Sequence, residues 1–126
     1  MYEKYLSKKF DVKNFDCCHL ASEFLNDNFV INTSIIDNYP RIYTKNTAYF
    51  HIIDAFIKNG FVEVMDDYQK GDIIITKNPY GCCYVCVDDK TALTIQKQVQ
   101  IFELDVVNHL RHRSLLWNTQ KLKTTH

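Results

Sequence analysis

The first strong apolar pattern along the chain falls between Asp16 and Asn26. Its apolar members are spaced three and four residues apart, as on one face of a helix: Cys17, Leu20, Ala21, Phe24 and Leu25. Asp16 comes directly before them, and an aspartate at this position caps a helix by accepting hydrogen bonds from unpaired backbone N–H groups. We therefore predict an amphipathic helix that begins just after Asp16.

The same spacing recurs between Thr47 and Gly60. One face of this segment carries Tyr49, Ile52, Ile53, Phe56 and Ile57. Thr47 is a suitable N-terminal cap, and the pair Asn59-Gly60 is typical of a helix end. The segment is therefore predicted to be a second helix. Its aromatic residues are interpreted as core rather than as a surface on which bases stack: Tyr49, Phe50 and Phe56.

After Gly60 the pattern changes to short runs rich in Val, Ile and Tyr, which are typical of strands. These runs cover residues 61–64, 72–76, 83–87, 92–96 and 99–102, with turn-forming residues at 78–81 and 88–90. The segment 104–117 fits either a short helix or a strand, and the polar residues 119–126 are interpreted as a tail. We predict one α+β domain over residues 1–118, with N-terminal helices packed on a small antiparallel sheet.

Composition excludes several classes of partner. The chain has 126 residues, 46% of them hydrophobic, which suits one core. Fifteen basic residues balance fifteen acidic ones, so no overall field attracts nucleic acid or an anionic membrane. The sequence contains no run of about 20 apolar residues for a membrane span, and its start lacks the apolar core of a signal peptide. We expect synthesis in the cytoplasm, no nucleic-acid partner and no membrane insertion.

The cysteines form a poor framework for disulfides. They are five in number, and four of them form the adjacent pairs Cys17-Cys18 and Cys82-Cys83. On an extended strand the Cα atoms of Cys82 and Cys86 would lie about 13 Å apart, too far to share one zinc ion. Neither CxxC spacing nor a Gly-rich phosphate loop is present. We expect reduced thiols, strand cysteines that serve packing, and no metal or cofactor, although a metal site assembled from distant segments stays open.

Cys17 is the strongest candidate for chemistry. It is the first residue of the predicted helix, where unpaired N–H groups and the helix dipole stabilise a thiolate. A cysteine within an apolar stripe is nevertheless more often a packing residue than a nucleophile. Its position alone therefore leaves both interpretations open.

Four short segments follow one another along the chain. Residues 15–21 read Phe-Asp-Cys-Cys-His-Leu-Ala, and residues 70–75 carry a Gly-Asp dipeptide at the start of a predicted strand. Residues 81–89 form a predicted strand that ends in two aspartates, and residues 110–117 contain Arg and Trp. This order resembles the NlpC-type, papain-like cysteine peptidases, including short members encoded by tailed phages, from about residue 12 to residue 117. The resemblance implies a papain-like core with Cys17 in the position of the nucleophile.

The same resemblance reveals a departure at the site. It places Cys82 where the family has its general-base histidine, and Thr94 where the family has the polar residue that orients this base. A cysteine nucleophile needs a base within hydrogen-bond reach. No histidine lies between Ile52 and Asn108. A shift of register in that strand therefore cannot supply one.

The remaining histidines are the other candidates for a base. His19 follows Cys17 by two residues, so on a helix the two side chains point roughly 200° apart. His51 lies on the second predicted helix and reaches the site only if its face of that helix turns toward Cys17. The last segment is interpreted as a solvated face rather than as a catalytic pair: His109, Arg111, His112 and Arg113.

Two functional hypotheses follow from the resemblance. In the first, the fold is retained without catalysis, and the protein is a structural or assembly component of a bacteriophage tail whose partners are other tail or assembly proteins. In the second, Cys17 attacks an amide carbonyl of the stem peptide of peptidoglycan, and water resolves the thioester. Only three Gly and two Pro accompany many Asn, Lys, Ile and Tyr, a bias typical of AT-rich genomes such as those of some phages. The missing histidine favours the first hypothesis, which predicts synthesis in the cytoplasm of a bacterial host and incorporation into the virion tail.

Overall fold

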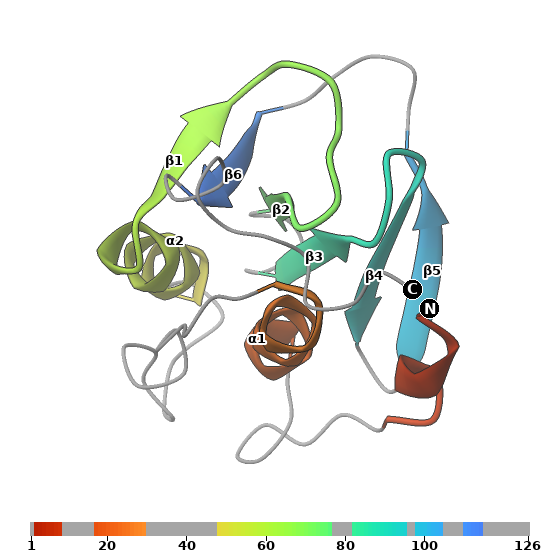
Figure 1. The fold of residues 1–126 in the computed structure, drawn as a ribbon. Helices are drawn as coiled ribbons and strands as arrows, with labels where there is room; N and C mark the ends of the chain where they lie inside the picture. The colour runs from red at the N-terminus through yellow and green to blue at the C-terminus, as the bar shows by residue number, and fades with distance from the viewer. Residues whose placement is uncertain are drawn as a thin grey trace.

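A computed structural model describes residues 2–8, 17–29, 48–76, 82–95, 98–104 and 110–114. Within these residues, the fold is α+β: two α-helices pack on one face of a six-stranded antiparallel sheet (Figure 1). A short 3-10 helix, η1 (Glu3–Tyr5), comes first. Tyr5 is buried, its ring packs against Phe24, and its hydroxyl donates a hydrogen bond to Asp27 at 2.7 Å. The predicted α+β class and the predicted order of helices before strands are confirmed.

The first α-helix, α1 (Cys17–Asn28), buries the whole predicted stripe. The second, α2 (Ala48–Lys58), does so only in part, because Ile52 and Phe56 are buried whereas Phe50 is 58% exposed and Ile57 is 52% exposed. The interpretation of Phe50 and Ile57 as core residues is therefore wrong. The capping residues predicted for both helices, Asp16 and Thr47, lie outside the described residues. Neither described α-helix has the length and apolar composition that crossing a membrane requires.

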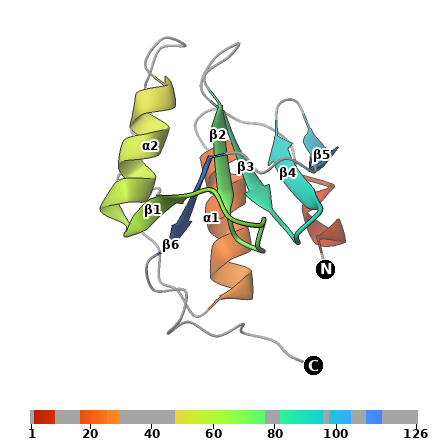
Figure 2. The same cartoon turned by 90° about the horizontal axis from the view of Figure 1, so that it is seen from above.

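The sheet does not follow the order of the chain. Its strands are β1 (Phe61–Val64), β2 (Ile73–Thr76), β3 (Cys82–Cys86), β4 (Thr91–Ile95), β5 (Val99–Glu103) and β6 (Arg111–Ser114). They lie in the order β1-β6-β2-β3-β4-β5, so the last strand is inserted between the first two (Figure 2). The segment 104–117 thus contributes a strand at 111–114, whereas 105–109 and 115–117 lie outside the described residues.

The two faces of the sheet differ in what they pack against. Side chains alternate along a strand, so neighbouring residues point to opposite faces. Cys83, Val85 and Leu93 point toward the helices and join the main core. Tyr84, Cys86 and Ala92 belong to a second, smaller cluster on the other face. The alternation of β3 therefore separates Cys83 from Cys86.

The last strand corrects the prediction of a solvated face. Arg111, His112 and Arg113 are 0%, 6% and 8% exposed, because β6 is an inner strand with neighbours on both sides. Both arginines bind one buried carboxylate: the Nε atoms of Arg111 and Arg113 donate to Asp72 at 3.0 and 2.7 Å. His109 lies outside the described residues.

Candidate functional site

Cys17 lies where the start of α1 meets β3. The apolar face of α1 packs against β3 and β4, so the first residue of the helix is held over the beginning of β3. The Cys17 side chain is 8% exposed, and its Sγ accepts a hydrogen bond from the backbone N–H of Cys83 at 3.4 Å. The predicted start of the helix is thus also the location of the candidate site, and the Cys17 side chain is almost completely buried.

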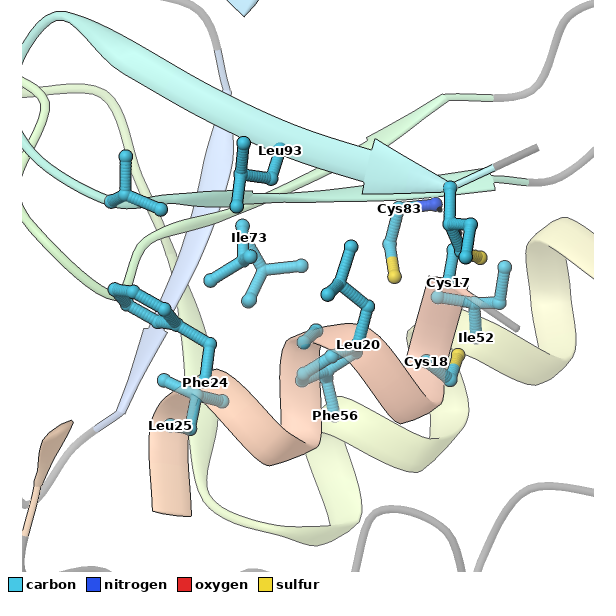
Figure 3. Packing of buried hydrophobic residues seen from close by; sticks show 14 of the residues in the cluster. Cys17, Cys18, Leu20, Phe24, Leu25, Ile52, Phe56, Ile73, Cys83 and Leu93 are labelled. Atoms are coloured by element: carbon cyan, nitrogen blue, oxygen red, sulfur yellow. Dashed lines mark hydrogen bonds between the residues drawn. The ribbon is translucent and has the colours of Figure 1, made fainter. Parts of the chain in front are cut away.

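Two further thiols lie beside it. Cys18 follows on α1, and Cys83 points from β3 toward the start of the helix (Figure 3). The three Sγ atoms of Cys17, Cys18 and Cys83 all lie within 4.8 Å of one another, and all three residues are buried. We call these three residues the thiol cluster. It joins two segments that are 66 residues apart, as the bond from Cys83 to Cys17 shows.

The two residues assigned to the missing base and its orienting group lie next to this cluster. The Sγ of Cys82 is 3.2 Å from the hydroxyl oxygen of Thr94, and that hydroxyl donates to the carbonyl of Cys83 at 2.8 Å. Because a hydroxyl has one proton to donate, the Cys82 thiol is the donor to Thr94. Cys82 and Thr94 are therefore neighbours in the structure, and Cys82 packs against the core that contains Cys17.

The surroundings of Cys17 keep it protonated. A hydrogen bond with Cys18 lowers the pKa of the Cys17 thiol, but hydrogen bonds with Cys82 and Cys83, together with burial, raise this pKa well above its ordinary value. A hydrogen bond that stabilises the protonated form of a thiol raises the pKa of that thiol. For Cys83, a hydrogen bond with Cys17 lowers the pKa, whereas Cys18 and burial outweigh it, and the net pKa is also well above the usual range. At neutral pH both groups are thiols, and a thiol is a poor nucleophile.

The described histidines lie on three different elements. His19 and His51 are half-buried on α1 and α2, and His112 lies on β6 opposite Glu63 of β1. The groups that shift the pKa of Cys17 are thiols instead. Sequence reasoning found Cys17, Cys82 and Thr94 but interpreted Cys83 as packing and assigned no role to Cys18. The alternation of β3 places Cys83 on the helix-facing side with Val85, and this signal was available in the sequence.

A second buried polar centre joins β2 to β6. Gly71 precedes it with φ +92°, a left-handed conformation that glycine adopts without strain. Asp72 follows and is 0% exposed. Its two carboxylate oxygens accept hydrogen bonds from Arg111 at 3.0 Å and from Arg113 at 2.7 and 2.9 Å. The aspartate of the Gly-Asp dipeptide is thus hydrogen-bonded to both arginines of the last strand.

An exposed carboxylate completes this centre. Asp66 accepts two hydrogen bonds from Arg113, at 2.7 and 3.0 Å, although its own side chain is 60% exposed. The hydrogen bonds with Arg113 hold the pKa of the Asp66 carboxyl below its usual range. The ring of Tyr68 lies 4.3 Å from the guanidinium carbon of Arg111, in a cation–π contact. We call Asp66, Asp72, Arg111 and Arg113 the charge network.

The face of the sheet that is turned away from α1 carries a hollow of about 170 Å³. Its wall includes the edge-to-face pair Tyr84 and Phe102, whose ring centroids are 5.0 Å apart. The lining is mostly apolar: Tyr68, Ile74, Thr76, Tyr84, Ala92, Phe102, Glu103 and Leu104. This hollow and the thiol cluster lie on opposite faces of the sheet, so it is not a substrate pocket for Cys17.

Comparisons of the chain with protein-family models, with curated proteins and with solved structures found no match. Function therefore has to be inferred from the geometry of the thiols and of the charged residues.

Proposed function

We propose that this protein has an NlpC-like, papain-like fold without a catalytic base and acts as a structural or assembly component of a bacteriophage tail. One observation carries the proposal. The side chain that hydrogen-bonds with Cys17 from the predicted histidine position is a thiol, Cys82, and it raises the pKa of Cys17. A histidine there would act in the opposite direction, because a neighbouring imidazolium stabilises a thiolate.

The contacts between distant segments support the fold part of this proposal. Cys17 begins a helix that packs on β3, and the following strand, β4, brings Thr94 to Cys82. At the other end of the resemblance, Asp72 of the Gly-Asp dipeptide holds the two arginines of the last strand. Segments on which the resemblance rests therefore touch one another, which supports the proposed core arrangement.

The chemistry of the site supports the non-catalytic part. A nucleophile and its base act as a unit, so loss of the base removes most of the rate. Thr94 donates its proton to the carbonyl of Cys83 and has a thiol rather than an imidazole to orient. The phage setting rests on the resemblance to short phage-encoded members and on the composition. The partners expected in this setting are other tail or assembly proteins of the phage.

One observation favours the second candidate, an active peptidase that cleaves the stem peptide of peptidoglycan. Cys17 is the first residue of α1, and the N–H of Cys83 donates to its sulfur at 3.4 Å. Both the helix start and this donor stabilise a thiolate. In that mechanism the thiolate would attack the amide carbonyl, the amine would leave with a proton, and water would hydrolyse the thioester.

The two candidates are separated by two measurements on the wild type and on Cys17→Ser. The first measures the release of stem peptides from purified cell walls, and the second measures sedimentation of the chain with phage tails from infected cells. We expect no release of peptide by either protein and equal sedimentation of both. Cys86→Ser is the matched control, because Cys86 is a buried thiol on the opposite face.

Peptide release that is lost in Cys17→Ser and kept in Cys86→Ser would establish the peptidase instead. Absence of the wild-type chain from sedimented tails would contradict the assembly role.

A further inference from the structure

The thiol cluster has a property that neither proposed function uses. Three sulfur atoms converge in a buried place at the start of α1, and sulfur is the ligand that thiophilic metal ions prefer. We propose that Cys17, Cys18 and Cys83 together bind one thiophilic divalent metal ion, with Zn²⁺ as the ordinary case. The proposal does not depend on the proposed function.

The spacing of the sulfurs suits such an ion. Zinc binds thiolate sulfur at about 2.3 Å, so two sulfurs of a tetrahedral site are about 3.8 Å apart. The three Sγ atoms already lie within 4.8 Å of one another. An inward movement of about 1 Å or less, within the reach of side-chain rotation, would bring all three to the distances of a zinc site.

The charge balance favours a divalent ion. Binding converts three thiols to thiolates and releases three protons, which leaves one net negative charge with Zn²⁺ and two with a monovalent ion such as Cu⁺. Buried charge is costly, so the smaller excess is favoured. Two features already present stabilise a negative charge here: the start of α1 and the N–H of Cys83, which donates to the Cys17 sulfur.

A fourth ligand is needed to complete the tetrahedral coordination that zinc adopts. The thiol of Cys82 is half-buried and packs against the core that contains the three cysteines. Either this thiol or a water molecule can complete the site. Spacing within one segment could not reveal such a site, because two ligands come from α1 and one comes from β3.

The experiment uses the reduced chain of 126 residues in an oxygen-free buffer. Co²⁺ is titrated first, because thiolate-to-cobalt charge transfer gives an absorption band, and Zn²⁺ is then added to displace it. We expect the band to saturate at one equivalent and to disappear with Zn²⁺. Binding should release about three protons per ion if water is the fourth ligand and about four if Cys82 is. X-ray absorption of the zinc-bound wild type should show at least three sulfur ligands at about 2.3 Å.

Variants assign the ligands. Cys18→Ala and Cys83→Ala should each weaken Zn²⁺ binding more than about 100-fold, since even the loss of an outer-shell partner costs 10- to 100-fold. Cys86→Ala, the buried thiol of the other face, should bind as the wild type does. The absence of a saturable band, fewer than three sulfur ligands in the wild type, or equal weakening in Cys86→Ala would overturn the proposal. The wild-type measurements decide the question even if a variant fails to fold.

Discussion

The molecule contains two buried polar centres that are built on opposite principles. The charge network places Asp72 and Arg111, both 0% exposed, in direct contact between β2 and β6. The thiol cluster places three neutral groups together between α1 and β3. Each centre joins segments that are far apart in the sequence. A buried charge without a partner is strongly unfavourable, whereas a buried thiol packs as a small apolar group. The charge network therefore holds β2 and β6 in a defined arrangement. The thiol cluster, whose groups are neutral, can take on another function such as metal binding.

The geometry of each centre agrees with this difference. Both Nε donors of the arginines are directed at the same carboxylate, so β6 has a defined position beside β2. Around Cys17, by contrast, one partner thiol lowers its pKa and two raise it. A metal ion can displace the protons of the thiols into solvent, whereas the arginines keep theirs near neutral pH.

The largest expected effect is on the charge network. Asp72→Asn leaves two buried guanidinium groups facing a neutral amide, and removal of one partner from a buried ion pair typically costs about 3–5 kcal/mol. We expect the free energy of unfolding, measured with urea, to fall by about this amount.

Asp66→Asn is the matched control for Asp72→Asn. It removes a carboxylate that also contacts Arg113, but this carboxylate is 60% exposed, so solvent can replace it. The loss should be clearly smaller than for Asp72→Asn. Equal losses in the two variants would show that burial of the pair does not determine the stability of this strand.

The two centres also differ in how far the sequence predicted them. The stripe of α1 was found because its apolar residues repeat with the helical period, and Cys17 was found because it begins that helix. Residues 111–114, Arg-His-Arg-Ser, carry no apolar signal, so their burial was missed. Their burial depends on Asp72, 39 and 41 residues away from the two arginines, and a local pattern contains no such information.

The thiol cluster was predicted in part for a related reason. The resemblance located Cys82 and Thr94 because it compares positions along a strand. Cys18 and Cys83 become partners only when α1 is laid against β3, and that packing cannot be read from either segment alone.

The next effect concerns the position of the missing base. Cys82→His would place an imidazole beside Cys17, and an imidazolium neighbour lowers the pKa of a thiol. We expect alkylation of Cys17 near neutral pH, located by peptide mass mapping, to become at least about tenfold faster, which corresponds to about one pKa unit or 1.4 kcal/mol.

Phe102→His is the control for Cys82→His. It adds an imidazole on β5, at a 38% exposed residue that lines the hollow on the other face of the sheet. The reactivity of Cys17 should then stay at the wild-type rate. If Cys82→His leaves this rate unchanged, Cys82 does not occupy the position of the base.

The smallest expected effect comes from a polar group of β6 outside the charge network. His112 is 6% exposed, and its buried Nδ1 has no hydrogen-bond partner among the described residues. Burial lowers the pKa of the His112 imidazole, and this outweighs the opposite influence of Glu63. As the pH falls, the unfolded chain therefore binds a proton at this histidine before the folded protein does. The contribution of His112 to stability is complete above the unfolded pKa of about 6.5 and is lost progressively below it.

The measurement is the free energy of unfolding of the wild type and of His112→Gln between about pH 7 and pH 5.5, a window that spans the unfolded pKa. The wild type should lose more stability across this window, because the variant has the same carboxylates without the buried imidazole. Parallel curves would mean that His112 reaches a proton acceptor or water in the folded state. A steeper wild-type curve would show that a positive charge on β6 is stable only beside Asp72 and Asp66. The strand would then contain paired, charged arginines and a buried imidazole that has to stay neutral.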